Sequence, residues 1–223
     1  MEQLRKTHNL AKRELINKWV PKGSQVLDCG CGRGGDLAKW RGMNVNLFMI
    51  DPDEESLLEA QKRAHEMNYG VWFLPKGDIR DAAHQSGPWD IVCYNFALQY
   101  IFENDTVFDF SIKAIEKSLE VGGRLMGMVP DETRIRAMLG NSSKFVDKLG
   151  NSIELRDGKL WVHLTDGPFY ATGARPEPLV DVQKLIKALD DQGFHMSMWL
   201  PMLDKPNGLI SDMYSKFVFT KIR

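Results

Sequence analysis

One short segment of the chain gathers most of the residue types that could bind a ligand. Residues 26 to 40, VLDCGCGRGGDLAKW, contain four glycines and two aspartates, Asp28 and Asp36. The segment begins as an apolar run and ends in a helical pattern, so the glycines fall in a turn between a strand and a helix. Glycines there let a ligand approach the backbone closely, as nucleotide sites require. We expect Gly30 and Gly32 to face that ligand.

The spacing of this segment distinguishes between ligands. A dinucleotide site reads G-x-G-x-x-G and places a pyrophosphate at the helix N-terminus. Here the order is D-C-G-C-G-R-G-G-D, with a carboxylate on each side of the glycines. Two carboxylates would repel a pyrophosphate, but they suit the sulfonium and ammonium groups of S-adenosylmethionine. The motif therefore favours this methyl donor over NAD and resembles the first signature of the class I methyltransferases.

Two further acids end predicted strands. Asp51 closes the strand 46–51, and Asp78 closes the strand 71–78 with Ile79 beside it. The resemblance to class I methyltransferases implies that Asp51 binds the ribose hydroxyls and that Asp78 receives the adenine amino group. The alternative is structural: Asp51 would cap the helix that starts at Asp53, and Asp78 would only end a strand.

The elements that must position these residues alternate along the chain. Apolar runs predict strands at 24–30, 46–51, 71–78, 89–97 and 124–130, and helical patterns cover 53–67 and 107–123, the second ending at two glycines. Such alternation predicts an α/β, Rossmann-like fold with a mostly parallel central sheet and helices on both faces. Ligands of such sheets bind at the carboxyl ends of the strands.

The pattern changes after Pro130. The following residues predict a helix and short antiparallel strands, then an amphipathic helix at 179–194 and a C-terminal antiparallel strand pair at 195–203 and 213–222. We predict a single methyltransferase domain over residues 1–223. Its parts are a basic helical segment at about 1–22, a cofactor half at about 23–130 and a substrate half at about 131–223.

Composition limits the class of protein. The chain has 223 residues, of which 43% are hydrophobic and 26% charged, and this suffices for one core. No apolar run approaches the roughly 20 residues of a membrane span, and the N-terminus is too charged for a signal peptide. We therefore expect an intracellular protein with no membrane partner. The three cysteines, Cys29, Cys31 and Cys93, predict buried thiols rather than a disulfide framework or a metal site.

Charge is uneven although the net charge is only −1. Residues 1–41 hold nine lysines and arginines against four acids. This basic excess favours an anionic partner near the N-terminal end. The alternative is an amphipathic helix whose basic face is simply solvated.

Five motifs resemble, in this order, the mRNA cap guanine-N7 methyltransferases. They are HNLAK (8–12), GCGRGGDLAKW (30–40), NFALQYIF (95–102), RPEPLVD (175–181) and MYSKFVFTKI (213–222). The match spans nearly the whole chain, and its compact length suggests a viral or otherwise divergent member. The resemblance implies capped RNA as substrate and other capping-enzyme domains or a stimulatory subunit as partners. It implies the nucleus as location for a cellular protein, and the cytoplasm or virion for a viral one.

The same resemblance implies a role for particular residues. The S-adenosylmethionine site would consist of Lys12, Asp28, Gly30, Gly32, Asp36, Asp51, Asp78, Ile79 and Asn95. The guanine pocket would consist of Phe96, Tyr100, Glu177 and Tyr214, and the triphosphate would meet Arg33, Lys39 and Arg41. Three positions depart from the family pattern: Asn95 replaces glutamine, Gln99 replaces histidine and Pro178 replaces an aromatic residue.

The chemistry of such a pocket needs few reactive groups. Guanine N7 already carries a lone pair, so methyl transfer requires orientation rather than a general base. Glu177 can accept from the N1–H and 2-amino groups of guanine, and Phe96 and Tyr100 can form an apolar wall. The structural alternatives are core packing for the two aromatic residues and solvent exposure for Glu177. Trp40 is assigned to packing.

Three other functions are compatible with the motifs. A small-molecule methyltransferase would share the cofactor half, and a methyltransferase-like capping subunit would keep the fold without turnover. A nicotinamide oxidoreductase is disfavoured by the acids that flank the glycines. No metal site is predicted.

Overall fold

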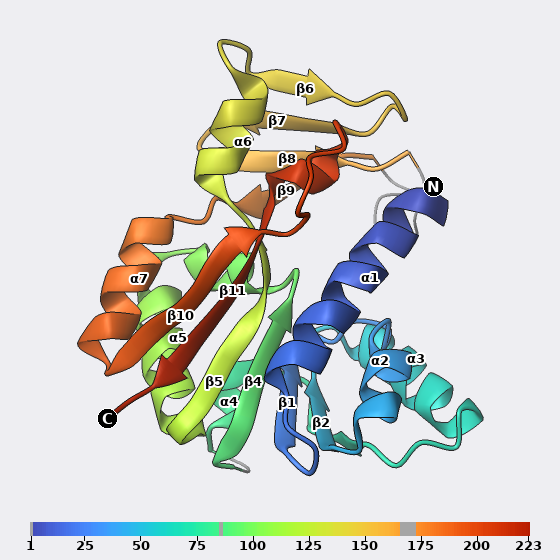
Figure 1. Cartoon of the computed structure of the whole chain (residues 1–223), viewed down its shortest axis with the longest axis vertical. Coiled ribbons are helices and arrows are strands. Elements are labelled where there is room, and N and C mark those ends of the chain that lie inside the picture. The colour runs from blue at the N-terminus through green and yellow to red at the C-terminus, as the bar shows by residue number, and fades with distance from the viewer. Residues whose placement is uncertain (1, 85–86, 166–172) are drawn as a thin grey trace.

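The computed structural model describes residues 2–84, 87–165 and 173–223, and its centre is a seven-stranded sheet (Figure 1). The strands of this sheet are β1 (Gln25–Cys29), β2 (Asn46–Ile50), β3 (Trp72–Phe73), β4 (Trp89–Asn95), β5 (Leu119–Pro130), β10 (Phe194–Pro201) and β11 (Tyr214–Lys221). Their order is β10-β11-β5-β4-β1-β2-β3.

The pairing within this sheet confirms the predicted fold class. β1 pairs in parallel with β2 and with β4, and β5 continues the parallel order beside β4. β11 is antiparallel to both β5 and β10, so the predicted C-terminal strand pair is present. β2 and β3 are added on one side of β1, and β4 and β5 on the other, so the strand order reverses between β1 and β4. Ligands of open α/β sheets bind at such a switch point.

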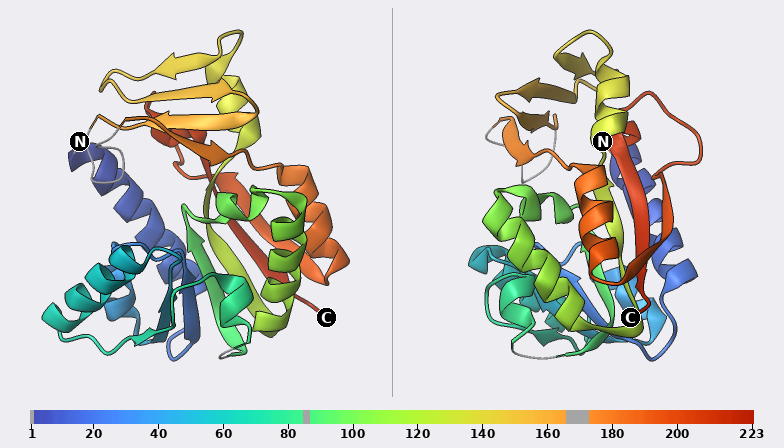
Figure 2. Two further views of the ribbon diagram at one scale, coloured as in Figure 1. Left: turned by 180° about the vertical axis from the view of Figure 1, so that it is seen from behind. Right: turned by 90° about the vertical axis from the view of Figure 1, so that its left-hand side faces the viewer.

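Helices cover both faces of the central sheet (Figure 2). The longer ones are α1 (Glu2–Trp19), α3 (Glu54–Glu66), α5 (Asp105–Ser118) and α7 (Val182–Asp191). A further helix, α6 (Glu132–Leu139), lies beyond the end of β5 instead (Figure 1). Neighbouring residues of β1 point to opposite faces, as in any strand. Val26 accordingly packs in the core that contains Ile16 of α1, whereas Leu27 packs in the core that contains Ile112 of α5 and Leu189 of α7.

A second, four-stranded sheet lies beyond the carboxyl end of β4 (Figure 1). Its antiparallel strands confirm the pattern predicted after Pro130. They are β6 (Lys144–Val146), β7 (Ser152–Arg156), β8 (Lys159–His163) and β9 (Arg175–Pro178). β9 contacts the short 3-10 helix η2 (Leu98–Phe102), which follows β4, and this contact places the second sheet over the site described below.

Several predicted boundaries differ from the observed ones, among them the late helix, predicted at 179–194 and observed at Val182–Asp191. Three others concern the central sheet and the helix between β4 and β5. The third strand covers only Trp72–Phe73 instead of 71–78, because Pro75 cannot donate to a ladder and Asp78 instead caps α4 (Ile79–Ala82). The fourth strand ends at Asn95 rather than residue 97. The helix predicted to reach the glycines of 107–123 ends at Ser118, and the residues after it pair with β4 as the start of β5.

Within the described ranges, no helix is long and apolar enough to cross a membrane. Cys29 and Cys93 are buried free thiols and Cys31 is partly buried, as the sequence predicted. Burial raises the pKa of each of these thiols.

Candidate functional site

The carboxyl ends of β1, β2 and β4 meet around the glycine-rich turn. Gly30 and Gly32 have φ values of 68° and 52°, a region that glycine enters without steric cost. A Cβ atom on Gly30 would lie 2.4 Å from the Cβ atom of Ala97, so the turn packs directly against the segment that follows β4. The turn and that segment therefore form one continuous site at the switch point.

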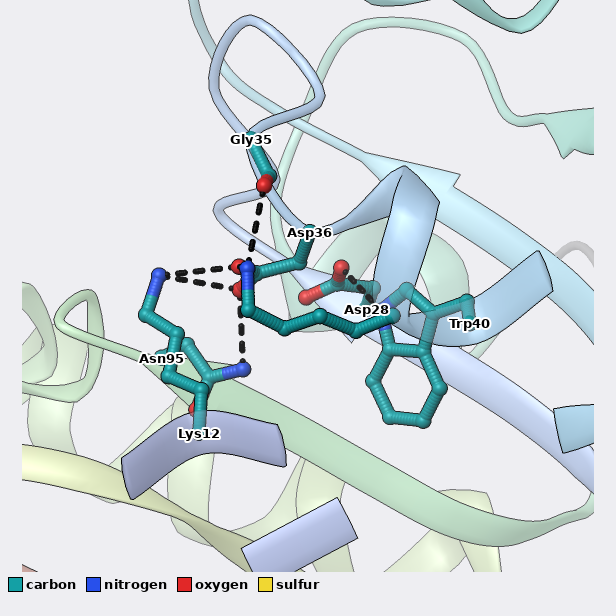
Figure 3. Close-up of polar contacts among 7 residues, drawn as sticks. Lys12, Asp28, Gly35, Asp36, Trp40 and Asn95 are labelled. Carbon is teal, nitrogen blue, oxygen red and sulfur yellow. Dashed lines mark hydrogen bonds and ion pairs between the residues drawn. The ribbon is translucent and has the colours of Figure 1, made fainter. Parts of the chain in front are cut away.

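Asp36 is the centre of a charged cluster in this site (Figure 3). Lys12 of α1 donates to both of its carboxylate oxygens at 3.0 Å, and Lys39 of α2 (Leu37–Trp40) donates at 2.7 Å. The side-chain amide of Asn95 donates to the same carboxylate at 3.0 Å. Burial alone would raise the pKa of Asp36, but the two ammonium groups outweigh it and lower that pKa. Asp36 is thus an ionised carboxylate whose charge is already balanced.

Asp28 lies beside this cluster in a different state. It is 2% exposed and accepts one hydrogen bond from Trp40 Nε1 at 2.9 Å. Burial, and then the nearby Asp36 carboxylate, raise the pKa of Asp28 to about 7. The assumption that both acids offer their charge to a ligand was therefore wrong for Asp36. Trp40 is fully buried, as expected, but it also orients Asp28, a role that the sequence did not indicate.

The side-chain oxygen of Asn95, at the end of β4, is an unused acceptor. Its amide nitrogen donates to Asp36, which fixes the orientation of the amide group. The oxygen is buried and has no hydrogen-bond partner among the described residues. A buried acceptor without a partner costs about 1–3 kcal/mol, so a bound donor there would gain that energy back. The ammonium group of an amino-acid ligand is a donor of the required kind.

Asp51 ties the glycine turn to β2. Its two oxygens accept from the backbone N–H of Gly32 at 2.7 Å and of Asp53 at 2.9 Å. The helix cap is Asp53, which accepts from the backbone of Ser56, so the alternative that Asp51 caps this helix was wrong. Burial raises the pKa of Asp51.

Asp78 does not end a strand, as the structural alternative had it, because β3 stops at Phe73 and Asp78 is the N-cap of α4. It is held near β2 by a hydrogen bond from Gly77 N to the backbone oxygen of Asp51 at 3.1 Å. It also caps α4 and accepts from the Arg80 guanidinium, which lowers the pKa of Asp78 against the opposing effect of burial. Ile79 beside it is fully buried.

An aromatic cluster adjoins the charged cluster. The rings of Phe96 and Tyr214 lie edge to face at 4.7 Å, and the His8 ring lies 5.1 Å from the first and 5.6 Å from the second. Phe96 is not a strand residue, because its φ of 65° turns the chain out of β4. Lys12 Nζ sits 4.9 Å from the Phe96 ring, so Lys12 joins the two clusters. The sequence reasoning missed His8, although it lies in the same motif and on the same helix face as Lys12.

Glu177 reaches this region from β9. It is 5% exposed, so the alternative of a solvent-facing side chain was wrong. Gln99 Nε2 donates to Glu177 at 3.1 Å and to the backbone oxygen of Phe96 at 3.0 Å. Tyr100 is 55% exposed at the edge of this group. Burial and the Glu177 carboxylate raise the pKa of Tyr100 to about 12.

The three predicted phosphate contacts separate into two kinds. Lys39 is buried against Asp36 and the backbone oxygen of Gly35, so the prediction that it meets phosphate was wrong. Arg33 and Arg41 lie exposed near the glycine turn. Among the described residues, no group of three or more His, Cys, Asp or Glu side chains is arranged to hold a metal ion.

Comparison with known proteins gives one family. The family model described as "mRNA (guanine-N(7))-methyltransferase domain" matches residues 1–156. The mRNA cap guanine-N(7) methyltransferase of Eremothecium gossypii is 29% identical over 89% of this chain, and that of Saccharomyces cerevisiae is 34% identical over 68%. The matched parts make up 53% and 38% of those relatives, so the chain spans about half of their length or less.

Solved structures agree on the fold. An S-adenosylmethionine-dependent methyltransferase from Clostridium acetobutylicum aligns with a TM-score of 0.66 at 14% identity, covering 96% of this chain and 91% of that one. The CcbJ methyltransferase from Streptomyces caelestis aligns with a TM-score of 0.68 at 14% identity, covering 96% and 90%. At this identity the likeness concerns the fold, which is that of the Rossmann-like methyltransferases.

Proposed function

The chain belongs to the mRNA (guanine-N(7))-methyltransferase family, and we propose that it transfers a methyl group from S-adenosylmethionine to N7 of the guanosine cap of RNA. One observation carries this proposal. The charged cluster around Asp36 contacts Phe96 through Lys12, and Glu177 is linked to Phe96 through Gln99, so a donor and a base bound to these two groups would be neighbours.

The residues of the charged side fit S-adenosylmethionine. The unpartnered Asn95 oxygen and the Asp28 carboxylate suit the ammonium group of its amino-acid end. Asp51 follows β2, and Asp78 at the start of α4 is held beside it through Gly77, so the ribose and adenine would follow there. Bound there, the sulfonium supplies an activated methyl group. Lys12 and Asp36 balance one another and hold the Asn95 amide in position. These roles are part of the proposal.

The residues of the other side fit a guanine. Glu177 supplies an acceptor for the base edge, and the rings of Phe96 and Tyr214 supply an apolar wall with Tyr100 at its rim. His8 stays neutral because burial, and then the neighbouring Lys12 ammonium, lower its pKa to about 4. A neutral ring at this place adds no charge that would oppose the positive charge moving onto the methylated base.

The chain itself needs no proton transfer for this reaction. N7 presents its lone pair in the plane of the ring, so the walls must hold that plane in line with the methyl group and exclude water. Orientation of this kind can contribute about 7–11 kcal/mol to the rate. Arg33, Arg41 and the exposed basic residues of α1 would meet the cap triphosphate and RNA phosphates.

Partners and setting belong to the same proposal. Because the chain spans half or less of its relatives, other capping domains or a stimulatory subunit are proposed partners rather than observed ones. We also propose a single methyltransferase domain over residues 1–223, with a cofactor half at about 23–130 and a substrate half at about 131–223. An intracellular location and a viral or divergent origin remain predictions from the sequence.

Methyl transfer from labelled S-adenosylmethionine tests the function. We expect label on GpppG-capped RNA and none on uncapped RNA. A small-molecule methyltransferase would instead label metabolites and would not be inhibited by GpppG. A capping subunit without turnover would bind S-adenosylhomocysteine in calorimetry and label neither RNA.

A further inference from the structure

Like Asn95, Gln99 carries a side-chain oxygen that is an unused acceptor. Gln99 belongs to the group around Glu177 that we propose to bind the base. The residue is 2% exposed, and its side-chain oxygen is buried with no hydrogen-bond partner among the described residues. Its nitrogen, by contrast, has two partners, the Glu177 carboxylate at 3.1 Å and the backbone oxygen of Phe96 at 3.0 Å. The amide nitrogen therefore donates both of its hydrogen atoms, whereas the amide oxygen accepts none from the described residues.

The orientation of this amide follows from its partners. A side-chain amide can be turned over in a structure, because its oxygen and nitrogen are similar in shape. Here both partners of the nitrogen are acceptors, a carboxylate and a carbonyl. A turned amide would place its oxygen against two other oxygens and lose both hydrogen bonds. The carbonyl oxygen is therefore the end of the amide that makes no hydrogen bond to Glu177 or Phe96.

We propose that Gln99 is a specificity-determining residue whose side-chain oxygen, next to Glu177, accepts one of the two donors on the guanine base edge. This inference rests on the proposed function and names a residue that reads the base. The family pattern has histidine at this position, and an imidazole has no carbonyl oxygen, so the device belongs to this chain.

The chemistry of purines matches two neighbouring acceptors to guanine. Guanine presents two adjacent donors, N1–H and the 2-amino group. Adenine presents an acceptor at N1 and a carbon-bound hydrogen at position 2, and hypoxanthine lacks the 2-amino group. With either of these bases at least one of the two acceptors, Glu177 and Gln99, would be buried against a ligand that cannot donate to it. A site built to hydrogen-bond a group rejects ligands that lack it for this reason.

The neighbours of Gln99 make its position firm. Phe96, which receives one of its hydrogen bonds, is held in the left-handed region by its own N–H bond to the backbone oxygen of Met128 at 2.9 Å. Glu177 is held in β9, whose backbone pairs with Leu160 of β8. Acceptors fixed in this way lose little freedom when a base binds, and that favours selectivity.

The test measures binding of symmetric cap dinucleotides by calorimetry in the presence of S-adenosylhomocysteine. Unaltered protein should bind GpppG about tenfold more tightly than IpppI and more tightly still than ApppA. Gln99→Met keeps the length of the side chain but removes the acceptor. We expect it to weaken GpppG binding about tenfold and to reduce the preference for GpppG over ApppA by a similar factor.

Controls separate the inference from folding and from the proposed function. Gln61→Met changes an exposed glutamine of α3 and should alter neither affinity. S-adenosylhomocysteine binding should be the same in both variants. The inference is overturned if unaltered protein binds GpppG and IpppI equally, or if Gln99→Met weakens all dinucleotides by one factor. Failure of unaltered protein to bind or methylate any cap would instead overturn the proposed function.

Discussion

Two groups of residues meet at Phe96: the charged side around Asp36 and the aromatic side around Glu177. Both use the same arrangement of hydrogen bonds with different chemistry. On each side an amide side chain donates its nitrogen to a buried carboxylate and leaves its oxygen without a described partner: Asn95 on Asp36, and Gln99 on Glu177. The charged side adds two ammonium groups, which bring the donors on Asp36 to three side chains. On the aromatic side the observed donor to Glu177 is a neutral amide.

This difference gives the two carboxylates different roles: Asp36 stabilises the structure of the site, and Glu177 is available to recognise the base. Because Lys12 and Lys39 balance Asp36, its carboxylate orders the site more than it attracts a cation, and Asp28 is the acid whose ionisation still responds to a ligand. Glu177, which accepts from the Gln99 amide, suits the donors of an uncharged base. Variants on the two sides should therefore fail in different ways.

The largest effect should come from Asp36→Ala. It leaves the ammonium groups of Lys12 and Lys39 buried without their carboxylate, and breaking a buried ion pair on one side costs about 3–5 kcal/mol. Urea unfolding should show this loss. Glu59→Ala, which breaks the exposed pair with Arg63, should cost at most about 1 kcal/mol. An equal loss in the free energy of unfolding for the two variants would mean that Asp36 does not stabilise the site.

Cofactor affinity should depend on pH through Asp28. Its pKa is raised to about 7 in the empty site, and an ammonium ligand favours the ionised carboxylate, so binding releases a proton and weakens as pH falls. From about pH 7.5 to about pH 6 the affinity for S-adenosylhomocysteine should fall roughly eightfold. Asp28→Asn should bind more weakly and with a flatter pH profile. An unchanged slope in this variant would assign the proton to another group.

A smaller effect is expected at the rim of the pocket. Tyr100→Phe removes only a hydroxyl group from a half-exposed ring, so methylation of capped RNA should fall about threefold to tenfold. The affinity for S-adenosylhomocysteine should stay at the level of unaltered protein. A loss of cofactor affinity would place Tyr100 on the charged side of the site.

The smallest effect should appear at the two exposed arginines. Arg33→Ala and Arg41→Ala should each reduce the slope of log affinity for capped RNA against log salt by about 0.7–0.9. The matched control is Lys113→Ala, which removes an exposed lysine of α5, on the face of the sheet opposite α1, and should leave this slope unchanged. A flat salt response in unaltered protein would make the basic N-terminal region structural.

The sequence predicted the charged side well because its residues are close along the chain. Strand periodicity located β1, β2 and β4, and the glycine spacing placed Asp28 and Asp36 on the two sides of one turn. It could not show that the two acids differ, because that depends on Lys12 folding back from α1 and on Trp40 donating to Asp28.

The aromatic side was predicted only through the family resemblance. Its members come from α1, the end of β4, β9 and the start of β11, and no periodicity relates segments so far apart. His8 was missed for this reason, and Gln99 was noted only as a departure from the family pattern. The turn at Phe96, which divides the two sides, follows from a positive φ that the sequence does not indicate.

The most direct test of this division measures two quantities in Glu177→Gln. Replacing the carboxylate by an amide should lower methyl transfer to GpppG-capped RNA by about 10- to 100-fold, the usual cost of a charged hydrogen bond. The affinity for S-adenosylhomocysteine should equal that of unaltered protein, because Glu177 is linked to Gln99 rather than to the Asp36 cluster that we assign to the cofactor. Unchanged methyl transfer, or a parallel loss of cofactor affinity, would contradict the account.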